Sequence, residues 1–412
     1  MKWILKYPVF LSFALLYFFC NNIFLPQGLL YTALFTPLFL FWLYKEDRIK
    51  NLIKWSILLI VPIPFHVYLG FDIRTYIIST GLVITAWVFL FTAIEALQKM
   101  KDKLEEVFEF VLFVNFVLVI FILIGLYFVP DNSVFWYIKR ITHGVSIFPR
   151  LMLMSYEPSH YALLLTPVYL FFILKILTGQ AKYNRLLIIG VGLPLFLTLS
   201  FGVVGAIIIA IAFVLVVYFR KLPIITKRIV LFGFPFLFAV TLILWQAWPN
   251  NVVFVRLENV FLGTDTSTNG RIKYAFSIAN DFVLHYKAWF GIGPGQIKIL
   301  FNDLIANFYH SESLYEGVWR IPNSMAELLA TYGYYGIILK FGFEVYFFIR
   351  LKIYQNLYSL SLFIFIFIYQ FTGSFIVNIA ELGIWAMVFQ SKFTDFNIEK
   401  LRKSSMKQKF DN

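Results

Sequence analysis

Long apolar runs recur along the whole chain, and they constrain its fold more than any other feature. The runs are continuous and each is about 20 residues long, the length at which a helix crosses the hydrocarbon core of a bilayer. A membrane β-barrel would instead show stretches of about 10 residues with alternating polarity. The pattern predicts an all-α polytopic membrane protein with about 12 transmembrane helices. The runs lie at residues 8–24, 28–44, 55–70, 76–97, 107–129, 160–178, 186–200, 203–219, 229–247, 326–349, 357–372 and 374–391.

The composition excludes an ordinary soluble domain. Hydrophobic residues make up 60% of the chain and charged residues only 14%, whereas soluble domains carry about 25% charged residues. Cys20 is the only cysteine, which excludes an intramolecular disulfide and a thiolate metal site. Lys2 and Lys6 precede the first apolar run and no small-residue cleavage site follows it, so we expect an uncleaved first helix.

The net charge of +13 could indicate nucleic-acid binding, but its placement favours membrane topology. Basic residues follow every second apolar run, which is the positive-inside pattern of cytoplasmic loops. We therefore expect both termini in the cytoplasm and two long loops, residues 130–159 and 248–325, outside. The basic residues are Lys45, Arg48, Lys50, Lys54, Lys99, Lys101, Lys103, Lys182, Arg185, Arg220, Lys221, Lys227, Arg228, Arg350, Lys352, Lys392, Lys400, Arg402, Lys403, Lys407 and Lys409.

These assignments divide the chain into four segments. Residues 1–129 hold helices one to five, residues 130–247 an external loop and helices six to nine, residues 248–325 the large external loop, and residues 326–412 the last three helices and a basic cytoplasmic tail. Within the large loop an apolar stripe with helical spacing predicts a helix over residues 271–290 that lies on the bilayer surface. The stripe comprises Ala275, Phe276, Ala279, Phe282, Val283 and Trp289, and a second amphipathic segment covers residues 296–309.

Arg150, Glu157 and His160 form the first candidate site, at the boundary of the sixth run. Ionisable groups are costly beside hydrocarbon, so they indicate function. The guanidinium could bind an anionic headgroup, and the carboxylate or imidazole could transfer a proton. In the alternative reading Arg150 extends its charge to the interface and Glu157 belongs to a helix start, because proline follows it.

A second group of candidates lies in the large external loop. Arg271 follows Asn269-Gly270, and its planar guanidinium group can bind two phosphate oxygens at once. The alternative is an arginine that lies in a turn and contacts only solvent. Gly293 and Gly295 would let the backbone approach a ligand closely. The remaining candidates for substrate binding are His310, Arg320 and Asn323, with a solvated His310 and a helix-capping Asn323 as the alternatives. Thr198-Leu199-Ser200 makes a tight external turn.

No cofactor or metal is expected. The histidines are scattered, and although Glu157 and His160 have the spacing of a helical metal-ligand pair, no second pair supports them. No glycine-rich phosphate loop occurs, so a nucleotide bound inside the cell is not expected.

The order of these motifs over residues 145–340 resembles that of the O-antigen polymerase and O-antigen ligase superfamily of bacterial envelope glycosyltransferases. The first five helices resemble the family in hydropathy only. The motifs are Arg150, Glu157-Pro-Ser-His160, Leu197-Thr-Leu-Ser200, Gly270-Arg271, Gly291-Ile-Gly-Pro-Gly295, Asn323-Ser-Met-Ala-Glu327 and Gly333-Tyr-Tyr-Gly336.

This resemblance implies a reaction at the outer face of the plasma (inner) membrane of a bacterium. A polymerase moves the growing glycan from undecaprenyl diphosphate onto the next lipid-linked repeat unit, and a ligase moves it onto lipid A core. The family needs no sugar nucleotide and no obligatory metal. The resemblance implies that Arg150 and Arg271 hold the diphosphate and that Glu157 or His160 is the base. Ligases carry a histidine immediately before the asparagine of the third motif; Pro322 stands there, which favours a polymerase.

The implied partners are an undecaprenyl-diphosphate-linked oligosaccharide, membrane lipid, a chain-length regulator and the repeat-unit flippase, and no nucleic acid. A ligase is one alternative. A transporter or flippase of the same lipid is another, but no inverted repeat relates the two halves and the one large external loop suits an enzyme.

Overall fold

The computed structural model describes residues 8–22, 25, 29–100, 103–129, 134–138, 149–181, 184–222, 224–286, 288–300, 320–390 and 393–401. Within these ranges the protein is helical apart from one short antiparallel pair of strands, β1 (Trp136–Tyr137) and β2 (Arg150–Leu151). The predicted all-α class is therefore confirmed.

Each apolar run carries helix, but several are broken. The N-terminal third contains α2 (Pro8–Leu15), η1 (Leu16–Cys20), α3 (Tyr31–Leu34), α4 (Thr36–Lys45), α5 (Ile49–Ser56), η2 (Ile57–Leu59), α6 (Ile63–Leu69), α7 (Ile73–Lys99) and α8 (Leu104–Phe128). The middle contains α9 (Pro158–Leu177), α10 (Asn184–Thr198), α11 (Phe201–Tyr218), η3 (Phe219–Lys221), α12 (Ile224–Arg228), η4 (Ile229–Gly233) and α13 (Phe234–Ala247). The C-terminal part contains α18 (Ser324–Arg350), η7 (Ile353–Gln355), α19 (Leu357–Tyr369), α20 (Ile379–Gln390) and η8 (Thr394–Phe396).

Six helical segments of the described chain are long and apolar enough to cross a membrane. They are Ile49–Leu69, Ile73–Lys99, Leu104–Phe128, Pro158–Leu177, Phe201–Lys221 and Thr226–Ala247. The other runs form shorter helices or, in α18, a helix with several charged side chains and a kink at Gly333. The count of about twelve spans therefore stays a prediction.

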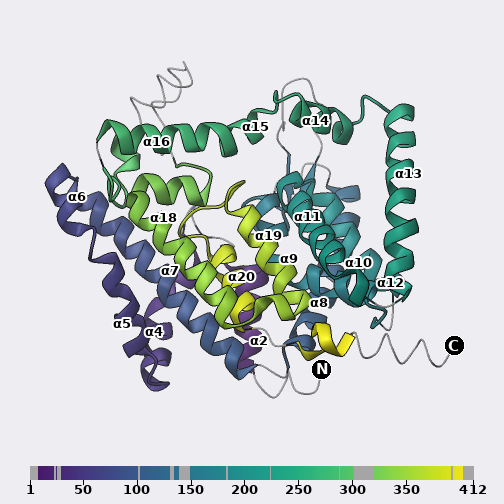
Figure 1. Ribbon diagram of the computed structural model, residues 1–412, viewed down its shortest axis with the longest axis horizontal. Helices are drawn as coiled ribbons and strands as arrows, with labels where there is room; N and C mark the ends of the chain where they lie inside the picture. Colours follow the sequence, from purple (N-terminus) through teal and green to yellow (C-terminus); the bar gives the residue numbers. More distant parts are fainter. Residues whose placement is uncertain are drawn as a thin grey trace.

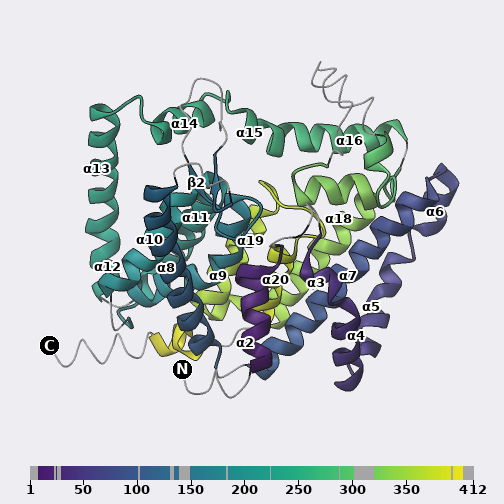
Figure 2. The ribbon, with the colours of Figure 1, turned by 180° about the vertical axis from the view of Figure 1, so that it is seen from behind.

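The core is centred on α9, which packs against α8, α10, α11, α19 and α20. Nearly all side chains from Pro158 to Phe172 are buried, so this apolar helix faces protein on every side. In contrast, α13 stands apart at one side of the molecule (Figures 1 and 2), and the membrane-length segment that contains it is not buried. Such a helix suits a lipid-facing position.

The predicted large loop is partly helical. It contains α14 (Val252–Phe261), α15 (Thr266–Asn269), the π-helical turn η5 (Gly270–Tyr274) and α16 (Ala275–His285), which together cross one end of the molecule (Figure 1). The C-terminal end of the described chain lies at the opposite end in both views (Figures 1 and 2).

The position of α16 corrects one expectation. Its apolar stripe is largely buried against α18, where the sequence predicted contact with a bilayer. Trp289, which the sequence placed in the same stripe, is 65% exposed because it follows the end of α16. Amphipathic spacing identifies the buried face of a helix, but it does not distinguish a protein neighbour from a lipid neighbour. The second amphipathic segment is described only to residue 300.

Candidate functional site

The start of α9 positions Glu157. Pro158 occupies the first helical turn, where its fixed φ and missing N–H are tolerated, and Glu157 precedes it with extended backbone. The Glu157 side chain makes no capping hydrogen bond to the helix. The carboxylate is thereby available for contacts outside α9, contrary to the alternative in which it serves only as a cap.

Glu157 instead forms an ion pair with Arg271. Arg271 Nη2 donates to Glu157 Oε1 at 3.1 Å, although 114 residues separate them. Ser159 Oγ donates a second hydrogen bond to the same carboxylate oxygen. The structure therefore brings together two of the four residues predicted to be catalytic.

The electrostatic effects on this pair are mutual. Burial alone would raise the pKa of Glu157, but the charge of Arg271 and the hydrogen bonds from Ser159 and Arg271 hold it below its ordinary value. Burial alone would lower the pKa of Arg271, and Glu157 raises it above its ordinary value. Both groups are therefore charged at neutral pH, and an ionised Glu157 can accept a proton only when its pairing changes.

Arg150 lies close to this pair but has its own contacts. Its Nε donates to the carbonyl oxygen of Thr198 at 2.9 Å and its Nη2 to that of Leu199 at 3.4 Å. These carbonyls belong to the C-terminal end of α10, where a cation is favourable. The turn itself is strained, because Leu199 has a φ of 44°. Arg150 thus combines a structural contact with proximity to Glu157 and Arg271.

Arg256 was not among the predicted site residues. It lies in α14, is 8% exposed, and stacks its guanidinium over the Phe201 ring at 4.8 Å. Its Nε is 3.5 Å from Oδ2 of the fully buried Asp265, and its Nη1 donates to the Leu199 carbonyl at 3.5 Å. A lone arginine within the apolar stretch Val252–Phe261 was the available signal in the sequence.

Arg150, Arg256 and Arg271, here called the arginine cluster, interact electrostatically with one another. Burial and the neighbouring charge of Arg256 lower the pKa of Arg150 to about 10, and burial lowers the pKa of Arg256. All three remain protonated at neutral pH. The cluster faces two carboxylates, Glu157 and Asp265, which leaves one positive charge in excess. Such a site favours an anionic ligand.

His160 lies one turn into α9 and is buried. Its ring stacks on Tyr156 with 4.5 Å between centroids, and its Nδ1 has no hydrogen-bond partner in the described part of the chain. Tyr156 itself is partly exposed and lies in the field of Glu157, Arg271 and Arg320. His160 also interacts electrostatically with Glu157.

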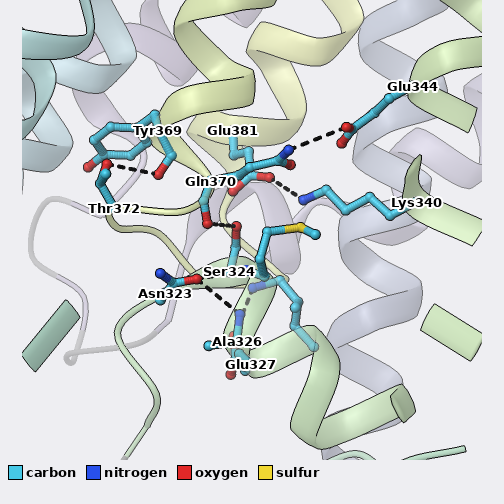
Figure 3. A network of polar contacts seen from close by, with 12 residues as sticks. Asn323, Ser324, Ala326, Glu327, Lys340, Glu344, Tyr369, Gln370, Thr372 and Glu381 are labelled. Carbon is cyan, nitrogen blue, oxygen red and sulfur yellow. Dashed lines mark hydrogen bonds and ion pairs between the residues drawn. The ribbon is translucent and has the colours of Figure 1, made fainter. Parts of the chain in front are cut away.

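Asn323 has a positioning role in this structure. Its Oδ1 accepts hydrogen bonds from the N–H groups of Met325 and Ala326 at 3.0 Å each, which caps α18 (Figure 3). Its Nδ2 donates to the carbonyls of Arg271 at 2.8 Å and Phe371 at 2.5 Å. The whole hydrogen-bonding capacity of the amide is used within the protein. Asn323 thus fixes the backbone of Arg271 and has no group left for a substrate.

Gly293 and Gly295 serve close packing in the structure. Both have positive φ, and a Cβ on Gly295 would lie 2.4 Å from Ser79 Oγ and 2.6 Å from the Thr75 carbonyl. A Cβ on Gly293 would lie 2.9 Å from the Tyr76 ring. These glycines let the loop approach α7 closely. The sequence had instead led us to expect that they would let the backbone approach a ligand. The loop is also held by Gln296, whose Oε1 accepts from the Asp72 N–H at 2.9 Å.

Arg320 lines a separate small cavity. The cavity has a volume of about 40 Å³ and also contacts Ser79, Gly295, Lys298 and Glu327. Burial and the charge of Arg320 lower the pKa of Lys298. A space of this size holds a water molecule or a single polar group. Arg320 acts electrostatically on Tyr156 as well, the residue that precedes Glu157.

His310, a predicted substrate-binding residue, lies outside the described residues. Among the residues that are described, no group of three or more histidine, cysteine or acidic side chains could hold a metal ion.

Comparison with protein-family models gives no match to this chain, and comparison with curated proteins gives none either.

Proposed function

We propose that this protein is a membrane glycosyltransferase that polymerises oligosaccharide repeat units carried on undecaprenyl diphosphate. The growing chain would be transferred from its lipid diphosphate onto the next lipid-linked unit, for O-antigen or for capsular or exopolysaccharide. The observation that carries the proposal is the arginine cluster with its excess positive charge beside Glu157, at the start of a helix that can cross a membrane. A lipid diphosphate presents its anionic group at the membrane surface, where the start of a membrane-spanning helix would lie.

In the proposed reaction an acceptor hydroxyl oxygen attacks the anomeric carbon of the donor. A carbon–oxygen bond to the acceptor forms, and the bond from the anomeric carbon to the diphosphate breaks. The diphosphate leaves as an anion that Arg271, Arg256 and Arg150 neutralise, which is the electrostatic contribution with the largest effect on such reactions. The proton of the acceptor hydroxyl passes to Glu157.

The ion pair gives this proposal a specific sequence of events. Without ligand, Glu157 is the anion that neutralises Arg271. A bound diphosphate would compete for Arg271, because it offers more charge and more acceptor oxygens. Glu157 would then lose its cation partner, its affinity for a proton would rise, and it could act as base. Glu157 would thereby become an effective base only when the donor, which carries the diphosphate leaving group, is bound.

The proposed location is the plasma (inner) membrane of a bacterium, with multiple spans, both termini in the cytoplasm and the α14–α16 segment outside. Two observations support this arrangement. Several helices are long and apolar enough to span a membrane, and the C-terminal end of the described chain lies at the opposite end of the molecule from α14–α16 (Figures 1 and 2). The proposed partners are the repeat-unit flippase and a chain-length regulator.

Deletion of the gene followed by gel separation of surface polysaccharide tests the proposal. A polymerase deletion leaves single repeat units on the surface, and complementation restores the ladder of longer chains. Complete loss of attached glycan would instead indicate a ligase. Accumulation of lipid-linked units on the cytoplasmic side would indicate a flippase.

A further inference from the structure

A second cluster of charged side chains lies inside the helical bundle, away from the arginine cluster. It comprises Lys340 and Glu344 of α18, Gln370 after the end of α19, and Glu381 of α20 (Figure 3). Glu344 is 4% exposed, Glu381 is 3% exposed and Gln370 is fully buried. Charged groups at such positions carry a large desolvation cost unless they are neutralised.

The contacts within this cluster neutralise only one carboxylate. Lys340 Nζ donates to Glu381 Oε1 at 2.8 Å, which makes an ion pair whose carboxylate is buried and whose lysine is partly exposed. Glu344 receives a hydrogen bond at 3.3 Å from Gln370 Nε2, a neutral amide. The charged groups that act on Glu344 are Lys340, from its own helix, and Glu381, from α20. Glu381 in turn acts on Glu327 of α18 and on Tyr369 of α19. Two carboxylates therefore share one ammonium group.

Three acceptor atoms in the cluster are left over. Glu344 Oε1, Gln370 Oε1 and Glu381 Oε2 are buried and have no hydrogen-bond partner among the described residues. A carboxylate oxygen only accepts hydrogen bonds when it is ionised, but it becomes a donor when it is protonated. One bound proton would remove the excess negative charge and turn one of these acceptors into a donor.

We propose that Glu344 holds an exchangeable proton at neutral pH and that this proton stabilises the packing of α18 against α19 and α20. A metal cation fits the site less well, since the Lys340 ammonium and the Gln370 amide hydrogens already point into it. Loss of the proton would leave two adjacent buried anions, Glu344 and Glu381, beside one cation.

Gln370 connects the proton site to the segment of the chain that supports Arg271. The Gln370 carbonyl accepts hydrogen bonds from Ser324 Oγ at 3.2 Å and from the Met325 N–H at 3.3 Å (Figure 3). These residues directly follow Asn323, which holds the backbone of Arg271. The proposal itself does not depend on the glycosyltransferase function.

Infrared difference spectroscopy of the purified protein during a pH titration tests the proposal directly. The wild-type protein should show the C=O stretch of a protonated carboxyl group at pH 7, and the band should disappear as the pH rises. The isosteric variant Glu344→Gln should lose the component of the band that belongs to Glu344, whereas Glu327, a second buried carboxyl group of α18, would keep its own component. Glu95→Gln is the matched control: Glu95 is also buried but has its own cation, Arg48, at 2.9 Å. The band should persist in that variant.

Lys340→Met gives a second test that does not require Glu344 to be changed. Removing the Lys340 ammonium group should strengthen proton binding by Glu344, so the band should persist to higher pH than in the wild type. Absence of a protonated carboxyl band in the wild type would overturn the proposal, as would an unchanged band in Glu344→Gln. A thermal midpoint that depends on sodium at fixed pH, without such a band, would show a metal-cation site instead and would also overturn it.

Discussion

At the scale of single residues, the pairing of Glu157 with Arg271 links stability to pH. The pKa of Glu157 is lowered in the folded protein, so its ionised form stabilises the fold. That stabilisation is fully present above the ordinary glutamate pKa of about 4.3 and is lost as the pH falls through the lower, folded value. The thermal midpoint of Glu157→Gln should therefore lie below that of the wild type at pH 7, and the two should converge in acid.

Glu258→Gln provides the control for this prediction. Glu258 is exposed in α14, so its substitution should leave the thermal midpoint unchanged over the same pH range. A difference between wild type and Glu157→Gln that persists unchanged at the lowest pH would show that charge pairing does not stabilise the site.

Arg256 and Asp265 make a second prediction at this scale. Arg256→Met leaves the Asp265 carboxylate without a cation in a buried site, which should cost about 3–5 kcal/mol of unfolding free energy. The double variant Arg256→Met, Asp265→Asn removes that charge and keeps an acceptor for the Thr268 N–H, now bound at 2.6 Å. Most of the lost stability should return. Equal midpoints for the single and double variants would show that the charges are not coupled.

At the scale of elements, the contact of the 291–295 loop with α7 depends on a glycine. Gly295→Ala should destabilise the protein through both its positive φ and its collision with α7. Gly263→Ala is a matched control, since Gly263 has a φ of +69° but a Cβ added there would meet no atom within 4 Å. The control should lose only about 1–2 kcal/mol, the backbone term. A thermal midpoint for Gly295→Ala equal to that of Gly263→Ala would contradict the packing role.

The sequence predicted the helical elements well because the period and length of apolar runs report directly on burial. It also singled out Glu157 and Arg271 as candidates, and the structure pairs these two side chains. The sequence could not show which side chains these residues contact. Arg256 meets Arg150 only because the strained turn at Leu199 presents one carbonyl to both. Contacts between residues far apart in the sequence depend on how helices pack, which periodicity does not specify.

The packing neighbours of other segments could not be predicted from the sequence either. The stripe of α16 indicated a buried face, but its neighbour turned out to be α18. The glycines of the 291–295 loop indicated that the backbone there approaches a neighbour closely, and in the structure that neighbour is α7. Lys340 and Glu344 lie four residues apart in α18, but nothing in the sequence relates them to Gln370 or to Glu381 of α20. Only the crossing of α18, α19 and α20 places these groups together (Figure 3).

At the scale of the whole molecule, membrane topology is testable with single cysteines in a Cys20→Ser background. Leu262→Cys places a thiol at an exposed position after α14, and Lys50→Cys places one at an exposed position in α5. A membrane-impermeant reagent added to intact cells should label position 262 and leave position 50 unlabelled until the membrane is opened. Labelling of position 50 in intact cells would contradict the proposed topology.

The central claim is that this protein elongates lipid-linked glycans by means of Glu157 and the arginine cluster. The most direct measurement is elongation by the purified protein in lipid vesicles, with lipid-diphosphate-linked repeat units extracted from the deletion strain. No nucleotide sugar is added. The wild-type protein should form a ladder of longer glycans and release the lipid diphosphate. Glu157→Gln should slow this by about 10²–10⁴-fold, as expected for loss of a general base. Repeat units that stay single with folded wild-type protein, or that only move across the bilayer, would contradict the account.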